Sequence, residues 1–185
     1  MMKRLVSKLV LCGDLAVGKT SIRRAYFGDG FIRDHLSTLG ADFAIKRVKI
    51  DTDTQLELQI WDLAGQPGFE SLRKRFFKGA SSAMLVFDLT RRETFENLDY
   101  WFSQLWEASP KKSMVIAVLG NKNDLQDHTV KEDEVEQFFK RLRDTYGLEQ
   151  ELMKYYETSA LTGENIEECF QFVSNAILDD IRQQK

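Results

Sequence analysis

Two glycines, a lysine and a hydroxyl stand at the spacing of a phosphate-binding loop near the start of the chain. The stretch 13–20 reads GDLAVGKT and lies between an apolar run and a stretch of helical period. Glycine leaves backbone N–H groups open to phosphate oxygens, and the following helix presents its positive N-terminus to the anion. We predict a nucleotide site in which Lys19 neutralises the phosphates and Thr20 ligates Mg²⁺.

A second group of polar residues ends the third apolar run, at 61–66 (WDLAGQ). Asp62 can stand behind Mg²⁺, and the N–H of Gly65 can meet a γ-phosphate. The side-chain amide of Gln66 both donates and accepts hydrogen bonds, so it can orient an attacking water. This group predicts a metal and a nucleophile beside the phosphate loop.

A third group, 121–124 (NKND), directly follows an apolar run. Asp124 can accept two hydrogen bonds from the N1–H and exocyclic amine that guanine presents and adenine does not. Lys122 can lie along the ring, Asn121 can tie this loop to the phosphate loop, and the Ser159-Ala160 backbone can donate to the guanine O6. Alone, such a stretch is usually only a turn, and its meaning comes from the other two groups.

The elements that must position these groups follow an α/β pattern, in which short apolar runs alternate with stretches of helical period around a mostly parallel sheet. Two alternating runs separated by a turn at 52–54 predict an antiparallel edge hairpin. Two runs that are apolar throughout predict strands buried on both faces. The predicted strands are 5–12, 42–51, 55–63, 82–89, 114–120 and 154–157, and the predicted helices are 20–27, 93–108, 131–146 and 165–182.

Bulk properties limit the classes of function. The 185 residues suit one domain, which we place at 1–185. Lys plus Arg number 26 against 29 Asp plus Glu, a net charge of −3, and no basic run could track a nucleic-acid backbone. Cys12 and Cys169 are expected to be reduced core thiols of a cytoplasmic protein. No apolar run approaches the roughly 18–20 residues that span a bilayer.

The three groups occur in a fixed order with two further motifs. In sequence order these motifs are GDLAVGKT (13–20), Thr38, WDLAGQ (61–66), NKND (121–124) and ETSA (157–160). This set resembles the Ras superfamily of small GTPases over essentially the whole chain. Three longer stretches are most similar to its Rab branch, namely 37–43 (STLGADF), 61–80 (WDLAGQPGFESLRKRFFKGA) and 85–98 (LVFDLTRRETFENL).

The resemblance implies a fold and an activity. The fold is a P-loop G domain with a six-stranded, mostly parallel sheet, one antiparallel edge strand and about five flanking helices. The activity is binding of GTP and GDP with Mg²⁺, hydrolysis of GTP, and a nucleotide-dependent switch that recruits effectors in membrane trafficking or signalling. The expected form is a cytoplasmic monomer that reaches membranes through partners.

Carried over residue by residue, the resemblance also implies the roles of individual residues. Gln66, Lys19 and Thr38 carry catalysis, with Gln66 placing the attacking water. Thr20, Thr38 and, through a water, Asp62 hold Mg²⁺. Phe31 packs against the guanine or, alternatively, anchors its loop in the core. The implied nucleotide contacts are Gly13, Leu15, Ala16, Val17, Gly18, Lys19, Thr20, Ser21, Phe31, Thr38, Gly65, Asn121, Lys122, Asp124, Ser159, Ala160 and Leu161.

Partners are implied at the two switch regions, Thr38–Phe43 and Gly65–Phe77, where effectors, an exchange factor and an activating protein would bind. Phe43, Trp61 and Phe76 resemble the aromatic cluster that Rab proteins present to effectors. The plainer interpretation is that these three rings only cap the sheet.

The sequence departs from the family pattern in places. Leu15 stands where Ras-type proteins have glycine and Rab-type proteins commonly a small residue. A bulky side chain at this position implies slow GTP hydrolysis and obstruction of an arginine supplied by an activating protein. Alternatively, a leucine that points into solvent would leave hydrolysis unaffected. Pro67-Gly68 replaces a charged pair, so we expect switch two to move differently. The chain ends without a cysteine, and residue 2 is Met, so no lipid anchor is predicted.

Two rival functions stay open. A non-hydrolysing adaptor that holds guanine nucleotide permanently is favoured by Leu15 and the missing lipid site, and opposed by Gln66 and Thr38. An ATP-dependent kinase with the same phosphate loop is opposed by Asp124 and the Ser159-Ala160 backbone.

Overall fold

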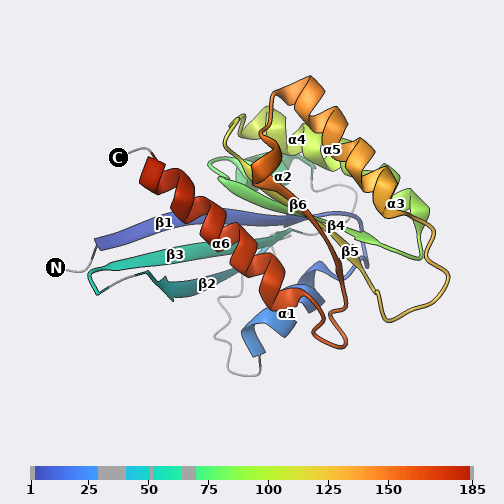
Figure 1. Ribbon diagram of the computed structural model, residues 1–185, viewed down its shortest axis with the longest axis horizontal. Coiled ribbons are helices and arrows are strands. Elements are labelled where there is room, and N and C mark those ends of the chain that lie inside the picture. Colours follow the sequence, from blue (N-terminus) through green and yellow to red (C-terminus); the bar gives the residue numbers. More distant parts are fainter. Residues whose placement is uncertain (1–2, 29–40, 51, 64–69, 184–185) are drawn as a thin grey trace.

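A six-stranded sheet with helices on both faces makes up the computed structural model, which describes residues 3–28, 41–50, 52–63 and 70–183 (Figure 1). The strand order is β2-β3-β1-β4-β5-β6. The strands are β1 Lys3–Cys12, β2 Ala41–Lys49, β3 Thr54–Leu63, β4 Ser82–Asp88, β5 Val115–Asn121 and β6 Met153–Thr158. The α-helices are α1 Lys19–Phe27, α2 Glu70–Phe77, α3 Arg92–Glu96, α4 Leu98–Ala108, α5 Glu132–Tyr146 and α6 Ile166–Gln183, and a 3₁₀ turn, η3, covers Gln150–Leu152.

Five of the strands run parallel, and one edge strand runs against them. β1 pairs in parallel with β3 and with β4, β4 with β5, and β5 with β6, while β2 is antiparallel to β3. The predicted α/β class and the antiparallel edge are therefore confirmed. The carboxyl ends of the parallel strands meet at one edge of the sheet, which is where open α/β sheets hold ligands.

Each face of the sheet carries its own apolar core. On one face, α2, α3, α4 and α5 cover residues such as Val10 and Leu85, and on the other, α1 and α6 cover residues such as Leu9 and Met84 (Figure 1). Every residue of β4 and of β5 is buried. The two apolar runs that predicted doubly covered strands are thus interior strands of the sheet.

The helix predicted as one element at 93–108 is divided at Asn97 into α3 and α4. The backbone bonds across the division are kept, since the Asn97 N–H donates to Glu93 O at 3.0 Å and the Trp101 N–H donates to Asn97 O at 3.1 Å. Taken together, α3 and α4 make one of about five helices, in agreement with the expected number.

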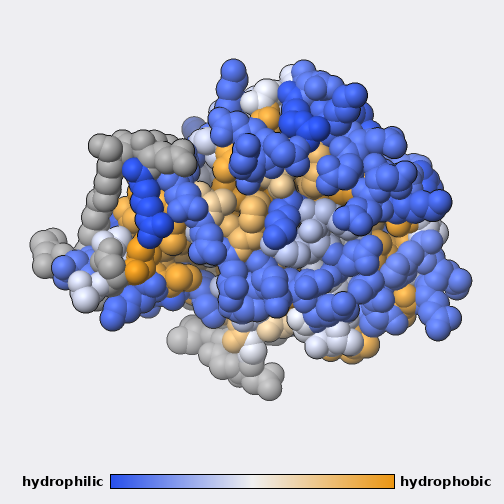
Figure 2. All heavy atoms as spheres, in the orientation of Figure 1, coloured by the Kyte–Doolittle hydropathy of each residue, from blue (hydrophilic) through white to orange (hydrophobic). Residues whose placement is uncertain are grey.

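Helix α5 shows how the helical period separates core from solvent. Its buried residues are Val135, Phe138, Phe139 and Leu142. The charged side chains face outward, and Arg141 pairs with Asp99 of α4 at 2.9 Å. Hydrophilic side chains cover most of the face drawn in Figure 2. No helix in the described part of the chain is long and apolar enough to cross a membrane.

Replacement of one α5 core ring tests this division. Phe138 is fully buried, so Phe138→Ala should lower the free energy of unfolding by about 3–5 kcal/mol through lost burial and the cavity left behind. The control is the preceding residue, Gln137, which is exposed. Gln137→Ala should change the free energy of unfolding by less than about 0.5 kcal/mol. Chemical denaturation measures both, and similar losses in the two variants would contradict the assignment of α5 faces.

Candidate functional site at the carboxyl edge of the sheet

The phosphate loop leaves β1 and enters α1 with two glycines that no other residue could replace. Gly13 has φ +143°, and a Cβ there would lie 2.0 Å from the Val86 carbonyl oxygen. Gly18 has φ +105°, and a Cβ there would lie 2.1 Å from Asn121 Nδ2. Both glycines therefore provide close backbone approach as well as a left-handed conformation.

Lys19 sits inside the loop that precedes it. Its side chain is buried, and Nζ donates to Gly13 O and to Asp14 O, both at 2.7 Å. Burial lowers the pKa of the Lys19 ammonium, and the nearby carboxylates of Asp62 and Asp14 oppose that shift. An ammonium held by neutral carbonyls at a helix N-terminus is a suitable partner for a phosphate.

The two residues predicted to serve Mg²⁺ are adjacent. Thr20 Oγ1 donates to Asp62 Oδ2 at 2.5 Å, because β3 runs parallel to β1 with Asp62 opposite Leu11. Burial raises the pKa of Asp62, while the Thr20 hydroxyl and the Arg23 guanidinium act in the opposite direction. A hydroxyl and a carboxylate are hard oxygen donors of the kind that Mg²⁺ takes, so these residues fit the expected ion.

Asn121, at the end of β5, joins the NKND loop to the phosphate loop. Its buried Nδ2 donates to Val17 O at 2.8 Å, and its Oδ1 accepts from Thr158 Oγ1 at 3.2 Å and from the Ala160 N–H at 3.3 Å. One side chain thus connects the loops that follow β1, β5 and β6.

The rest of the NKND loop is held by ion pairs and hydrogen bonds. Lys122 Nζ lies 2.6 Å from Asp88 Oδ2 at the end of β4. Burial raises the pKa of Asp88, but hydrogen bonds from Lys122, Thr90 and Arg91 outweigh it and lower the pKa to about 2. The exposed carboxylate of Asp124 accepts a hydrogen bond from Ser159 Oγ.

The described site residues therefore gather at one edge of the sheet, at the ends of β3 and β5 and on the segments that follow β1, β5 and β6 (Figure 1). Ala16 and Ser21 are exposed beside the phosphate loop. Leu15 is 55% exposed and Leu161 is 83% exposed, so both leucines stand at the rim. The predictions for Phe31, Thr38, Gly65 and Gln66 lie outside the described residues.

The structure adds residues that the motifs did not identify. Asp14 accepts from Asn97 Nδ2 and from Trp101 Nε1, both at 2.7 Å, and Arg91 Nη2 donates to Leu15 O at 3.1 Å. Helices α3 and α4 therefore support the outer side of the phosphate loop. The i, i+4 spacing of the asparagine and the tryptophan places them on one helix face, but nothing in the sequence indicates what that face meets.

The predicted aromatic cluster forms where β2, β3 and α2 meet. The ring centroids of Phe43 and Trp61, a cross-strand pair, are 4.8 Å apart, and those of Trp61 and Phe76 are 5.5 Å apart. All three side chains are half-buried, and Lys8 Nζ lies 4.6 Å from the Trp61 ring centroid. The rings cap the sheet and still present part of their surface to solvent.

Comparison with known proteins agrees with this geometry. The family model described as Ras family matches residues 8–179. The chain belongs to the Ras family. The Ras-related protein Rab7 of Drosophila melanogaster is 37% identical over 96% of this chain and 83% of its own length. The Ras-related protein RABA6b of Arabidopsis thaliana is 40% identical over 88% of this chain and 67% of its own length. The Ras-related protein RABA4b of the same plant is 35% identical over 96% of this chain and 75% of its own length.

Membership of the Ras family makes this chain a Rab-like small GTPase, with the guanine-nucleotide binding and GTPase activity general to that family. The predicted resemblance to the Ras superfamily and to its Rab branch is confirmed.

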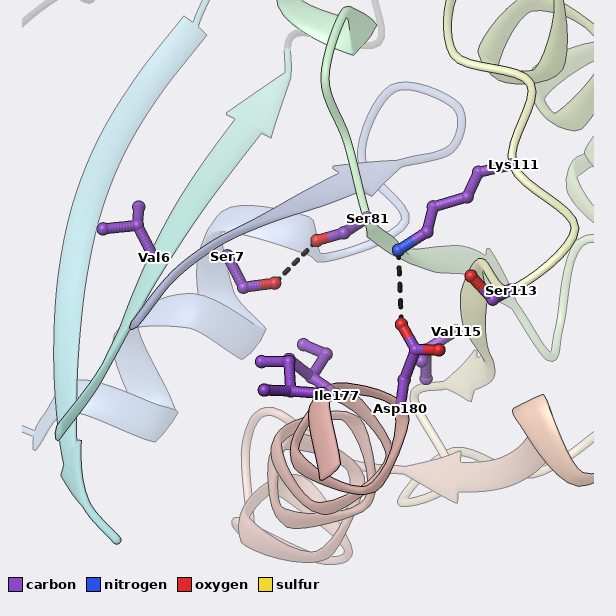
Figure 3. Close-up of a pocket in the computed structure, with 9 residues that line it drawn as sticks. Val6, Ser7, Ser81, Lys111, Ser113, Val115, Ile177 and Asp180 are labelled. Atoms are coloured by element: carbon purple, nitrogen blue, oxygen red, sulfur yellow. Dashed lines mark hydrogen bonds and ion pairs between the residues drawn. The ribbon is translucent and has the colours of Figure 1, made fainter. Parts of the chain in front are cut away.

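A separate cavity of about 150 Å³ lies at the other end of the sheet from the phosphate loop (Figure 3). It is lined by the first half of β1, the starts of β4 and β5, and α6. Four of its polar side chains form two pairs, Ser7 Oγ with Ser81 Oγ at 2.6 Å and Lys111 Nζ with Asp180 Oδ2 at 3.5 Å. In this Ras-family chain, this cavity and the described nucleotide motifs therefore lie at different ends of the sheet.

Removal of the Asn121 side chain tests how strongly the loops depend on it. Asn121→Ala leaves the Val17 carbonyl without this donor and should lower the free energy of unfolding by about 2–3 kcal/mol. The control is Asn123→Ala, which removes an exposed bond to Glu164 and should cost less than about 0.5 kcal/mol. Denaturant unfolding of both variants makes the comparison, and equal losses would contradict a central role for Asn121.

Proposed function

We propose that the chain, as one G domain over 1–185, binds GTP and GDP with Mg²⁺ at the carboxyl edge of the sheet. The observation that carries this proposal is the Asn121 side chain, which holds the phosphate loop, the NKND loop and the Ser159-Ala160 loop together. A nucleotide needs its phosphates and its base bound at a fixed separation. A single buried amide that bridges the corresponding loops supports such a spacing.

The ligand roles follow from position. Lys19 and the loop N–H groups bind the phosphates. Thr20, Thr38 and, through a water, Asp62 would hold Mg²⁺, which would offset phosphate charge when bound. Asp124 accepts from the guanine edge, with Ser159 Oγ already beside its carboxylate. Lys122 lies along the base, where Asp88 holds its ammonium.

Hydrolysis is proposed as in-line attack of water on the γ-phosphorus, with cleavage of its bond to the β–γ bridging oxygen, so that GDP and phosphate are the products. Gln66 orients the water, and Lys19 stabilises the charge that develops on the phosphoryl oxygens. Loss of the γ-phosphate releases Thr38 and Gly65, so that both switch regions relax. This chemistry separates the proposed switch from the non-hydrolysing adaptor, which would bind the same nucleotides and release no phosphate.

Partners are proposed at the two switch regions, where effectors, an exchange factor and an activating protein would bind. Phe43 and Phe76, one from each region, lie on either side of Trp61, and the three half-buried rings supply an aromatic surface. Because relatives that are 37% and 40% identical carry Rab names, we propose that the monomeric chain acts in membrane trafficking or signalling, cytoplasmic and peripheral to membranes through its partners.

Selection of guanine is tested at Asp124. Displacement of a fluorescent GDP analogue from the wild type should require far less GTP than ATP, and equal potency of the two would overturn guanine selection. Asp124→Ala loses hydrogen bonds to a charged acceptor and should weaken GDP binding by about 10- to 100-fold. Gln126→Ala, an exposed change in the same loop, should leave GDP affinity unaltered.

Leu15 is tested by single-turnover hydrolysis of GTP in wild type and Leu15→Gly. Removal of the side chain beside the expected water position should speed phosphate release by about tenfold, or about 1.4 kcal/mol of barrier. Gln66→Ala should slow phosphate release both in the wild type and in combination with Leu15→Gly. Equal rates for the wild type and Leu15→Gly would indicate that the exposed leucine is harmless, and absence of phosphate release from both would favour the adaptor.

A further inference from the structure

A buried arginine lies directly beneath the predicted magnesium site. Arg23 is on α1, one helical turn after Lys19, and its side chain is only 1% exposed. It is among the largest fully buried side chains of the described residues. A charged group buried this deeply requires partners of opposite charge.

Two carboxylates flank the Arg23 guanidinium. Nη2 pairs with Asp42 Oδ2, near the start of β2, and Nε lies 3.7 Å from Asp62 Oδ2. Asp62 Oδ2 is also the atom that accepts the Thr20 hydroxyl. The arginine and the predicted metal ligands therefore meet at one carboxylate oxygen.

The charge of Arg23 cannot be removed by deprotonation, because a guanidinium stays protonated in proteins. Charges that are buried a few ångströms apart interact more strongly than charges in water. An Mg²⁺ ion beside Thr20 and Asp62 therefore meets repulsion from a fixed cation. When the ion leaves, the same guanidinium still neutralises Asp62 and Asp42, so Arg23 favours the metal-free form over the metal-bound form.

We propose that Arg23 is a resident cation of the magnesium site, which weakens Mg²⁺ binding at Thr20 and Asp62. Arg23 thereby raises the Mg²⁺ concentration that the chain needs to retain its nucleotide. This inference rests on the proposed guanine-nucleotide function. Arg23 is not a ligand of the ion; it acts by the repulsion between its charge and the ion and by its pairing with Asp62.

The test is release of a fluorescent GDP analogue from the full chain over a series of free Mg²⁺ concentrations. Arg23→Leu should lower the Mg²⁺ concentration that halves the release rate by about tenfold, because the repulsion is removed. Arg23→Lys keeps the charge and should stay close to the wild type. The matched control is Arg24→Leu, an exposed change at the next residue, which should leave the Mg²⁺ concentration that halves the release rate unchanged.

Asp42→Asn provides a second variant that stays informative if Arg23→Leu does not fold, which circular dichroism reports. Asp42→Asn removes the carboxylate that offsets the charge of Arg23, so the Mg²⁺ concentration that halves the release rate should rise. The inference is overturned if this Mg²⁺ concentration is unchanged in folded Arg23→Leu. It is also overturned if this concentration stays level or falls in Asp42→Asn. In both cases binding of GDP itself would stand. Failure of the wild type to bind the GDP analogue at any Mg²⁺ concentration overturns the proposed function itself.

Discussion

The buried side-chain amide of Asn121 is the constraint on which the site depends. Its nitrogen donates to Val17 O, and its oxygen accepts from Thr158 Oγ1 and the Ala160 N–H. The same nitrogen would lie 2.1 Å from a Cβ at position 18, so the asparagine that ends β5 leaves no room for a side chain at the residue before Lys19. The geometry of the phosphate loop and that of the base loop are therefore coupled, although a hundred residues separate them.

Much of this arrangement could be predicted from the sequence, because strong local patterns carry it. Strands buried on both faces read as continuous apolar runs, and β4 and β5 were placed within a residue of their bounds. The alternating runs predicted the β2–β3 hairpin. The described phosphate-loop and NKND residues come together because each motif follows a parallel strand, and those strands all end at one edge of the sheet.

Contacts between distant residues could not be predicted in this way. The pairing of Asp14 with Trp101, or of Lys122 with Asp88, depends on how helices and strands pack, and a single sequence contains no pattern for it. Arg23 was missed because its neighbours on α1 suggest only an amphipathic helix, while its burial arises from β2 and β3. The outward direction of Leu15 is likewise a tertiary property. The roles of Thr38 and Gln66 stay predictions.

The distribution of charge explains why a phosphate would bind where Lys19 stands. Lys122 pairs with Asp88, and Arg23 pairs with Asp42 beside Asp62. Lys19, by contrast, donates to two neutral carbonyls. A phosphate that reaches Lys19 replaces neutral acceptors with charged oxygens, so the Coulomb attraction between opposite charges is added to the hydrogen bonds. Lys122 and Arg23 would have to give up carboxylates to bind the anion, whereas Lys19 would not.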